Sequence, residues 1–488
     1  MIETATTENT DVTVADVLDT IPNDSPLNDI SDHRIPESIK EPVAEEEIMH
    51  KNFRSDPFWQ SIPAFKDISE AEFLDYRFQN KQTITNKKGL EDFLMSVADA
   101  NFIEDVKQGL AKAPMNMRIS PYMLSLINWN DPYNDPIRIQ FMPVASTQLP
   151  NHPKLKLDSL HEQKDSPVSG LVHRYYDKAL FLPLDVCPVY CRFCTRSYAI
   201  GGDTETIDKV GYKLKRKRWN DAFAYLISRP EIEDVVVSGG DAYMLPSHHL
   251  QYIADMLLAI KHIRRIRFAT KGPAVMPMKI LSDSGWTNTL TDIVKRGRSL
   301  HKEVCLHTHF NSFNEITDIT RRAMNRLFEC GIKVRNQCVL IRGVNDSAQS
   351  IIRLNRMLSY MNVQPYYVYQ HDMVNGVEEL RTSLAATLEI ERTVRGSTAG
   401  FNTPTFVIDA PCGGGKRDVH SFDYYNQETG ISVYRSPSVD EEKAYLYFDP
   451  LHVLPEELQR SWQSGFQRKR MIQDALQKAG LQKLKIAS

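Results

Sequence analysis

The sequence predicts an α/β fold in which repeated strand and helix units place parallel strands in a doubly wound sheet or in a full or partial (β/α) barrel. Two observations predict it. From about Ala179 onward, short apolar runs rich in Val, Ile and aromatic residues recur along the chain, and stretches with helical spacing of apolar residues separate them. Strands that alternate with helices pair in parallel and are covered by helices. Because both architectures place chemistry at the carboxyl ends of strands, functional residues are expected there.

Seven apolar runs are the expected strands. They are residues 179–185, 234–238, 265–270, 304–308, 333–340, 366–370 and 405–409. Residues 250–258 and 351–361 lie between them and carry apolar side chains on one helical face. Ahead of the first strand, residues 87–113 also have helical spacing, which predicts a helical N-terminal region.

Length and composition indicate a globular chain with room for about three domains of roughly 150 residues each. It has 488 residues, of which 42% are hydrophobic and 25% are charged. No apolar stretch approaches the ~18 residues that a membrane span needs. The N-terminus has neither the basic region nor the apolar region of a secretion signal. We therefore expect a cytoplasmic protein without a membrane segment.

Negative charge is concentrated at the N-terminus. The first 50 residues contain thirteen acidic residues against Arg34 and Lys40 and have almost no aromatic residues, so they cannot bury enough apolar surface to become ordered. The chain is accordingly divided into four parts. These are a disordered acidic tail at 1–52, a helical N-terminal region at 53–165, a barrel at 166–410 and a C-terminal extension at 411–488, which begins with a lysine-containing loop.

Three of the seven cysteines form a Cys-x3-Cys-x2-Cys loop directly after the first expected strand. Cys187, Cys191 and Cys194 can direct three thiolates toward one centre, and soft thiolates suit zinc or an iron–sulfur cluster. Zinc usually takes a fourth ligand, for which His173 and the scattered cysteines are candidates. An iron–sulfur cluster with three protein ligands leaves one iron open. Inert buried thiols are the remaining alternative.

This cysteine loop is similar to the signature of the radical S-adenosylmethionine (SAM) enzymes. The resemblance implies a [4Fe–4S] cluster whose fourth iron holds SAM, and a partial (β/α) barrel of the radical SAM type. A second motif, Ser-Gly-Gly-Asp at 238–241, is an ordinary turn sequence by itself, but after the cysteine loop it resembles the motif that binds the SAM amino group. The implied SAM contacts are Phe193, Ser238, Gly239, Gly240, Asp241, His309 and Gln337. Taken alone, His309 and Gln337 would be satisfied core polar residues.

The third motif is Asp-Ala-Pro-Cys-Gly-Gly-Gly-Lys at residues 409–416, after the last expected strand. A phosphate-binding P-loop needs Ser or Thr after its lysine, but Arg417 follows Lys416, so ATP binding is not expected. A lysine can instead form a Schiff base with an aldehyde cofactor. Without its context, the segment would be a flexible turn with a solvated lysine.

Residues 165–425 carry these motifs in an order that resembles the lysine 2,3-aminomutase family, which adds pyridoxal 5′-phosphate (PLP) to radical SAM chemistry. The resemblance implies that Lys416 forms the PLP Schiff base. It also implies that Arg174, Tyr175 and Lys178 hold the PLP phosphate. Lys178 stands in place of an arginine and lacks the bidentate fork of a guanidinium.

Three charged residues determine the expected substrate. By resemblance, Arg196 binds the substrate α-carboxylate, and Asp372 and Asp409 bind the ε-ammonium of lysine. Two carboxylates at strand ends bind a cation and repel an acidic side chain. The implied reaction moves the α-amino group of L-lysine to carbon 3 and gives β-lysine, so the chain is expected to be an isomerase.

Other interpretations stay open at this point. The substrate could be another basic amino acid such as arginine, or the β-lysine could serve the modification of a translation factor. An electron-transfer iron–sulfur protein is a third hypothesis, which the combination of Lys416, Arg196 and the two aspartates opposes. The implied partners are an amino-acid substrate and an electron donor such as flavodoxin or ferredoxin.

Two departures from the family pattern lead to further expectations. The family's zinc cysteines have no counterpart, because no cysteine follows Cys412 and residues 345–347 supply none, so we expect no zinc. A homo-oligomer, either dimer or tetramer, is still expected. The basic run at 213–218 is expected to be a solvated loop before a helix rather than a nucleic-acid site.

Overall fold

A nine-stranded sheet is the centre of the computed structural model, which describes residues 47–487. Its strands follow one another in chain order from edge to edge. They are β1 (Leu171–Tyr175), β2 (Lys178–Phe181), β3 (Asp234–Val237), β4 (Arg265–Ala269), β5 (Glu303–Thr308), β6 (Val334–Val339), β7 (Val363–Tyr369), β8 (Thr405–Ala410) and β9 (Gly415–Asp418). Strands β2 to β8 pair in parallel, and the edge strands β1 and β9 pair antiparallel with their neighbours.

The two edges of this sheet approach each other. The backbone N–H of Lys416 in β9 donates a hydrogen bond to the hydroxyl oxygen of Tyr175 in β1, at 2.9 Å. Side chains alternate across the strands, so that in β3 Val235 and Val237 join the hydrophobic core while Val236 lines a cavity inside the sheet. The sheet is a nearly closed barrel, and the predicted α/β class with a partial (β/α) barrel is confirmed.

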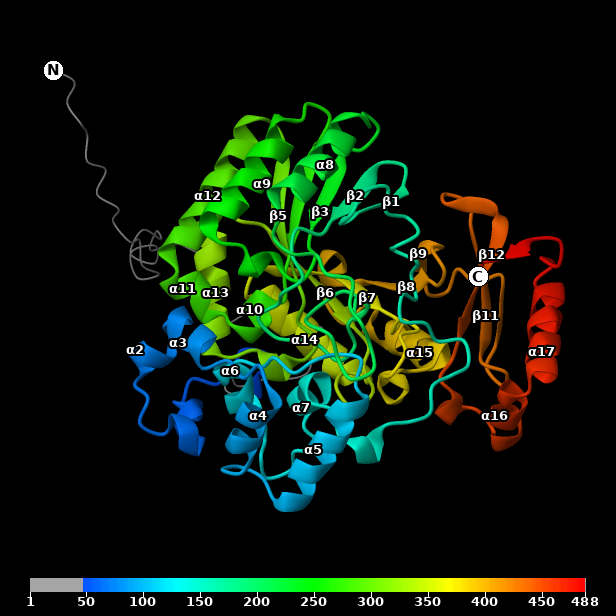
Figure 1. The fold of residues 1–488 in the computed structure, drawn as a ribbon, viewed down its shortest axis with the longest axis horizontal. Coiled ribbons are helices and arrows are strands. Elements are labelled where there is room, and N and C mark those ends of the chain that lie inside the picture. The colour runs from blue at the N-terminus through cyan, green and yellow to red at the C-terminus, as the bar shows by residue number, and fades with distance from the viewer. Residues whose placement is uncertain (1–46, 488) are drawn as a thin grey trace, which may run out of the picture. The chain divides into compact units, whose positions relative to one another are not determined.

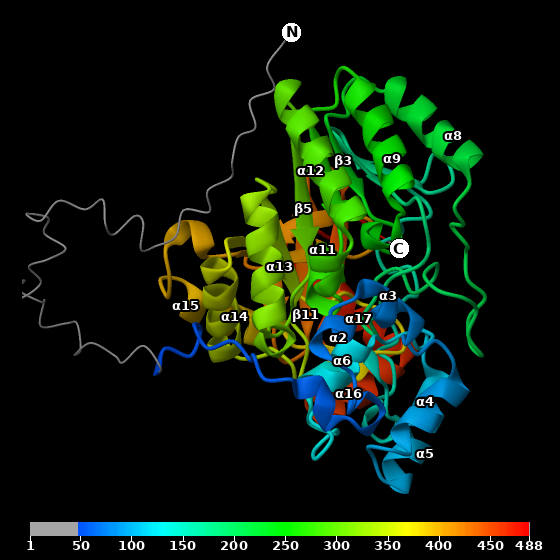
Figure 2. The ribbon, with the colours of Figure 1, turned by 90° about the vertical axis from the view of Figure 1, so that its left-hand side faces the viewer.

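Helices cover the outside of the barrel between its strands, as Figures 1 and 2 show for α8, α9, α12 and α13. The barrel helices are α8 (Arg216–Ile227), α9 (Ser247–Ala259), α10 (Gly272–Val275), α11 (Met278–Ser282), α12 (Ser284–Ser299), α13 (Asp318–Glu329), α14 (Ala348–Tyr360) and α15 (Leu384–Val394). Both predicted apolar faces belong to helices, since α9 buries Leu250 and Ile253 and α14 buries Ile351 and Leu358. Within residues 47–487, no helix is long and apolar enough to cross a membrane.

Short helices precede the barrel, as the sequence predicts for this region. They are α2 (Glu70–Phe73), α3 (Tyr76–Lys81), α4 (Lys87–Leu94), α5 (Ala100–Lys112), α6 (Pro121–Leu126) and α7 (Pro136–Phe141). Residues 87–113 form two helices, α4 and α5, because Asp99 caps the second one by accepting the backbone N–H of Phe102 at 2.8 Å. Residues 1–46 of the predicted acidic tail lie outside the described residues.

The N-terminal region holds the loop that contains the three clustered cysteines. The backbone N–H groups of Tyr190 and Arg192 donate to the carbonyls of Arg118 and Gln140, at 2.9 and 3.0 Å. Arg192 Nη1 also donates to the carbonyl of Ile139 in α7, at 3.0 Å. The helices ahead of the barrel therefore help to fix the loop that follows β2.

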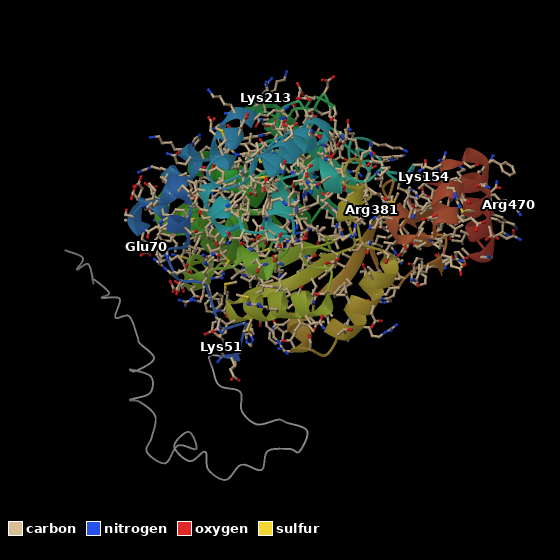
Figure 3. All side chains as sticks on the ribbon, turned by 90° about the horizontal axis from the view of Figure 1, so that it is seen from below. Lys51, Glu70, Lys154, Lys213, Arg381 and Arg470 are labelled. Carbon is tan, nitrogen blue, oxygen red and sulfur yellow. The ribbon has the colours of Figure 1, made fainter. Side chains whose placement is uncertain are left out.

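The basic run at 213–218 leads into helix α8, which begins at Arg216. Lys213 is exposed and lies at the outer surface in Figure 3. Arg218 differs, because its guanidinium donates to the carbonyls of Leu182 and Pro183, both at 2.7 Å. Residues 213–215 are thus a solvated segment ahead of the helix, residues 216–218 belong to its first turn, and Arg218 supports the segment after β2.

Beyond β9 the chain forms a second, four-stranded sheet, which the sequence pattern does not predict. Its strands and helices are β10 (Tyr424–Asn426), β11 (Ile431–Ser436), β12 (Asp440–Phe448), β13 (Lys485–Ile486), α16 (Glu456–Gln463) and α17 (Gly465–Lys478). Figure 1 shows α16 and α17 beside β11 and β12, away from the barrel helices. The fully buried Trp462 of α16 donates its indole N–H to the carbonyl of Thr429 at 3.0 Å, which joins helix and sheet.

Two glycines after β3 allow its end to approach the segment that leads into the cysteine loop. The backbone N–H of Gly240 donates to the carbonyl of Leu184 at 2.6 Å. Gly239 has a φ of +90°, and a Cβ at Gly240 would lie 2.4 Å from the carbonyl oxygen of Val186. These glycines therefore serve a backbone-to-backbone contact, in addition to the ligand approach that the sequence suggests.

A methyl group at Gly240 is expected to displace the cysteine loop. Gly240→Ala should lower the free energy of unfolding by about 1–3 kcal/mol, because overpacking against backbone cannot be relieved by a side-chain rotation. Thermal and urea unfolding of the cofactor-free protein would measure the change. Gly400→Ala is the matched control, since a Cβ there meets nothing within 4 Å. Equal stabilities of the two variants would contradict the contact.

Candidate active site

A cavity of about 470 Å³ extends from the barrel interior to the loops after its strands. Every residue of the predicted site except Gly239 lines it. The predicted residues in the lining are Cys187, Cys191, Cys194, Phe193, Arg196, Ser238, Gly240, Asp241, His309, Gln337, Asp372, Asp409, Lys416, Arg174, Tyr175 and Lys178. The fold thus gathers residues that lie far apart in the sequence.

The three clustered cysteines face this cavity as free thiols. Burial raises the pKa of all three, and at Cys187 the negative charges of Asp241, Cys194 and Cys191 add to the rise. The thiols are close enough to influence one another and are protonated when no cation is near. Iron would reverse this balance, because a coordinating thiol is deprotonated by the metal.

Phe193 and His309 lie next to each other at the cavity wall. Their ring centroids are 5.6 Å apart with an interplanar angle of 65°. Burial lowers the pKa of His309 to about 3, so its imidazole is neutral, and its Nε2 lies 3.0 Å from Asn311 Oδ1. Lys271, which the sequence does not single out, donates from Nζ to the His309 carbonyl at 2.7 Å and to Glu315 at 2.9 Å. The rings of Phe193 and His309 thus offer apolar and aromatic surface to a flat ring of a ligand.

Asp241 faces the cavity and also accepts hydrogen bonds from the backbone. Its two carboxylate oxygens accept the backbone N–H groups of Tyr243 and Lys271, at 2.8 and 2.7 Å. Burial raises its pKa to about 6. A carboxylate oxygen can accept more than one hydrogen bond, so this bracing leaves acceptor capacity for the ammonium that the sequence assigns to it.

Gln337 belongs to a polar network on the inner side of the sheet. Its Nε2 lies 2.9 Å from His307 Nδ1, and its Oε1 accepts the hydroxyl of Tyr369 at 3.2 Å. His307 Nε2 is buried and has no hydrogen-bond partner within the described residues. Gln337 is therefore satisfied by protein groups, as the core-residue alternative describes, and its predicted contact with SAM stays a prediction.

Lys416 lies in a strand, not in a flexible turn. Its partner in the antiparallel register of β8 and β9 is Asp409, and Lys416 Nζ is 3.0 Å from Asp409 Oδ2. Nζ also lies 5.3 Å from the ring centroid of Tyr369. Burial lowers the pKa of Lys416, but the charge and hydrogen bond of Asp409 together with the nearby Tyr369 and Tyr175 hold the pKa well above the usual value. Asp409 therefore stabilises the ammonium.

Asp372 is half-buried, and its two carboxylate oxygens differ in their partners. Its Oδ2 accepts the hydroxyl of Thr195 at 2.7 Å, whereas Oδ1 is buried without a hydrogen-bond partner within residues 47–487. Burial raises the pKa of Asp372 to about 7, and the neighbouring charge of Asp409 adds to the rise. A buried acceptor that lacks a donor is costly, so this position favours a cationic ligand.

Arg196 is bound to a residue that the sequence does not single out, Glu162. Arg196 Nε and Nη2 lie 2.8 and 2.7 Å from the two Glu162 oxygens. The Tyr198 hydroxyl donates to the same carboxylate at 3.0 Å. Burial lowers the pKa of Arg196, but the carboxylate of Glu162 outweighs this and raises it above the usual value. Arg196 thus reaches the cavity as a fixed cation.

The predicted phosphate-binding residues lie at the β1–β2 side of the cavity. Arg174 pairs with Asp165 at 2.7 Å through Nε. Lys178 Nζ is 4.1 Å from the ring centroid of Tyr175. Arg267 of β4 lines the same cavity and adds a third cation that sequence reasoning does not identify. The group supplies positive charge to an anion, although Arg174 and Arg267 each already have an acidic partner, Asp165 and Asp234.

The residues missed by sequence reasoning differ in how visible they are. They are Glu162, Thr195, Arg267 and Lys271. Thr195 lies between Cys194 and Arg196, and Lys271 follows an expected strand, so position relative to strand ends could have identified both. Glu162 precedes the first strand in a segment without a recognisable motif, and only the tertiary structure brings it to Arg196.

A site for a single metal ion would need several ligating side chains around one point. Among residues 47–487, no group of three or more His, Cys, Asp or Glu side chains has the arrangement for one metal ion. The expectation that the chain binds no zinc stays a prediction.

Comparison with known proteins identifies the class to which this fold and cavity belong. The Radical SAM superfamily model matches residues 181–354, which run from β2 into α14 and include the three cysteines and Ser238–Asp241. The L-lysine 2,3-aminomutase of Clostridium subterminale is 38% identical over 357 residues, which cover 73% of this chain and 80% of that protein. The L-lysine 2,3-aminomutase of Bacillus subtilis (strain 168) is 35% identical over 369 residues, covering 75% and 73%.

The chain is therefore a radical SAM protein, and within that class it belongs to the lysine 2,3-aminomutase family. A glutamate 2,3-aminomutase of Clostridioides difficile (strain 630) is also similar, with 30% identity over 363 residues that cover 73% of this chain and 79% of that protein. Proteins named for different substrates are thus similar to this chain, and substrate choice has to be argued from the cavity.

The cofactors of this family are a [4Fe–4S] cluster, SAM and PLP, and the cavity residues fit them. Three free thiols line the cavity, as a cluster would require, and the rings of Phe193 and His309 line it where they would contact SAM. Lys416 and Lys178 also line it, and their amine and positive charge would suit PLP and its phosphate. Donor chemistry and position therefore agree with all three groups.

The raised pKa of Asp372 predicts how its removal affects stability at different pH values. The folded pKa of about 7 lies above the ordinary 3.8, so the stability from this carboxyl is fully present below the ordinary value and is lost as pH rises through 7. Asp372→Asn cannot ionise and is spared this loss. Relative to the wild type it should therefore gain about 1–3 kcal/mol of unfolding free energy between about pH 5 and about pH 8.

Urea unfolding of the cofactor-free proteins at these two pH values would measure this difference. The gain of Asp372→Asn should be larger at the higher pH. Asp292→Asn, at an exposed position, is the matched control and should show little change at either pH. A gain for Asp372→Asn that is the same at both pH values would contradict the burial of an ionised carboxylate.

Proposed function

We propose that the chain is an L-lysine 2,3-aminomutase, which moves the α-amino group of L-lysine to carbon 3 and forms β-lysine. One observation carries the choice of substrate: Asp372 Oδ1 is buried without a donor among the described residues, in a cavity that also contains Asp409. An ammonium group supplies the missing donors and the opposite charge. The ε-ammonium of lysine is such a group, and it lies at the end of the substrate that does not react.

The other end of the substrate is an α-carboxylate, for which Arg196 is the binding residue. Its guanidinium lines the same cavity and offers a planar pair of N–H donors to a carboxylate. Lysine is thus held at both ends, by Arg196 at the carboxylate and by Asp372 and Asp409 at the side-chain ammonium. Binding at two ends fixes the position of carbon 3 between them.

When bound, the cluster with SAM supplies a carbon radical that abstracts hydrogen, and PLP supplies an electron sink at the migrating nitrogen. The protein's own part at Lys416 is to position the amine. The ion pair with Asp409, whose Oδ2 lies 3.0 Å from Nζ, holds the ammonium at the cavity. The proton on Nζ must leave before the nitrogen can act as a nucleophile.

The same carboxylates oppose an acidic substrate. A glutamate side chain would bring a third carboxylate next to Asp372 and Asp409, where burial already raises the pKa of Asp372 to about 7. Like charges in a poorly solvated site disfavour one another strongly. The cavity is therefore better suited to lysine than to glutamate, and arginine is the second candidate because it also ends in a cation.

Further properties follow from this function. One-electron chemistry at the cluster requires an electron donor, for which flavodoxin or ferredoxin is suited. All seven cysteines are free thiols, which supports a place in the cytoplasm, where thiols stay reduced. We also propose a homo-oligomer, a dimer or a tetramer, whose interface does not depend on a zinc site.

Product formation would test the assignment directly. Anaerobically reconstituted enzyme with SAM, PLP and a reductant should convert L-lysine to β-lysine, convert arginine much more slowly and leave glutamate unchanged. Asp372→Asn should reduce kcat/KM for lysine by about tenfold to a hundredfold, because a charge-assisted hydrogen bond to the ammonium is weakened. Asp292→Asn serves as the control. Formation of β-glutamate, or of no β-amino acid at all, would refute the proposal.

Spectroscopy would test the role of Lys416 separately. Lys416→Ala should lose the visible absorbance of lysine-bound PLP after reconstitution, while iron and sulfide contents stay at the wild-type level. Lys483→Ala is the matched control, because Lys483 is exposed near the C-terminus, and it should retain the absorbance. Undiminished absorbance in Lys416→Ala would show that another amine holds PLP.

A further inference from the structure

Glu162 is a buried carboxylate whose position is fixed before any ligand binds. The side chain of Asp158 accepts the backbone N–H groups of Glu162 and Gln163, at 2.9 and 3.1 Å. The Glu162 carbonyl accepts the hydroxyl of Ser166 at 2.7 Å. The turn that carries Glu162 is therefore held at both sides, and its side chain is only 5% exposed.

Glu162 occupies one edge of the Arg196 guanidinium and leaves the other edge available. The bonds to Nε and Nη2 use two of the five N–H groups of the guanidinium. Within residues 47–487, Nη1 forms no hydrogen bond, and the Arg196 side chain is 24% exposed toward the cavity that it lines. Nη1 and the second N–H of Nη2 form a planar donor pair of the kind that binds a carboxylate.

This arrangement differs from the ion pairs that only stabilise the fold. Arg381 and Glu378 form such a pair at 2.8 Å, and their side chains are 0% and 1% exposed. Neither residue lines the cavity. Glu162 and Arg196 both line it, and their pair presents a guanidinium to a ligand instead of burying it completely.

We propose that Glu162 is the positioning residue of the carboxylate clamp: it orients Arg196 so that the free edge of the guanidinium meets the substrate α-carboxylate. Tyr198 assists by donating to Glu162 at 3.0 Å. An arginine side chain has several rotatable bonds, and fixing it before binding removes an entropic cost that the substrate would otherwise meet. The inference rests on the proposed aminomutase function, in which Arg196 binds the carboxylate.

Equilibrium binding to the reconstituted holoenzyme would test this role without requiring turnover. Two ligands are compared by titration calorimetry: L-lysine, and 1,5-diaminopentane, which is lysine without its carboxylate. In Glu162→Gln the Kd of lysine should rise by about tenfold, as expected for the loss of one well-oriented interaction. The Kd of the diamine should change by less than about twofold, because it never meets Arg196.

A double-mutant cycle with Arg196→Lys would separate positioning from general stabilisation. If Glu162 acts through Arg196, then the double variant should bind lysine no more weakly than Arg196→Lys alone. Glu378→Gln is the matched control, since it breaks a buried Arg–Glu pair away from the cavity. It is expected to lower thermal stability and to leave the ratio of the two Kd values unchanged.

Three results would overturn the proposal. They are equal losses of lysine and diamine binding in Glu162→Gln, additive effects of the two substitutions, and a wild-type enzyme that binds lysine no better than the diamine. Failure of the proposed function gives a different result, because the wild type would then form no β-lysine whichever ligand it binds. If arginine is the true substrate, the same comparison is made with arginine and its decarboxylated analogue.

Discussion

Two carboxylates, those of Asp372 and Asp409, lie in the cavity with Lys416, which forms an ion pair with Asp409 alone, and the rest of the site depends on this imbalance of charge. Lys416 can neutralise Asp409, with which it is paired across β8 and β9. Among the described residues, Asp372 has only the hydroxyl of Thr195 as a donor, so one of its oxygens stays unsatisfied. A buried charge without a partner is unfavourable. The unpaired oxygen of Asp372 therefore lowers the stability of the ligand-free protein, and binding of a second cation removes this unfavourable free energy.

The barrel makes this arrangement possible because its strands hold the three groups in fixed positions. Asp409 is in β8, Asp372 follows β7 and Lys416 is in β9, so consecutive strands hold the three groups. Hydrogen bonds among β7, β8 and β9 fix the backbone from which Asp409 and Lys416 extend and the strand that Asp372 follows. The site is therefore preorganised for a cationic ligand in the sense that its dipoles and charges need little rearrangement.

Features that depend on residues close together in the sequence could be predicted from it. The parallel strands carry Val, Ile or aromatic side chains at the positions that face the core, and these recurring short runs are visible in the sequence. Cysteine spacing and the Gly-rich segment before Lys416 are also local. Strand β1, Leu171–Tyr175, escapes such reasoning because it is short and contains polar residues. The glycines before Lys416 suggest a turn, which the structure has at residues 411–414, but the sequence does not show that Lys416 itself lies in a strand. Relations between distant segments cannot be predicted in this way. The pairing of Glu162 with Arg196 joins residues 34 positions apart, and neither has a sequence context that selects the other. A pattern of residue types predicts which groups are present, but packing decides which groups are already paired and which remain free for a ligand.

The proposed preference for lysine rests on the same distinction between paired and free charges. At the carboxylate end, Glu162 binds part of Arg196, so the net charge offered to a ligand is smaller than that of an isolated guanidinium. At the other end, Asp409 is partly neutralised by Lys416, whereas Asp372 is not. The uncompensated charge near Asp372 is thus negative. A cationic side chain near Asp372 is attracted and an acidic side chain is repelled. A change of substrate from lysine to glutamate would therefore require substitution of Asp372 before substitution of Arg196.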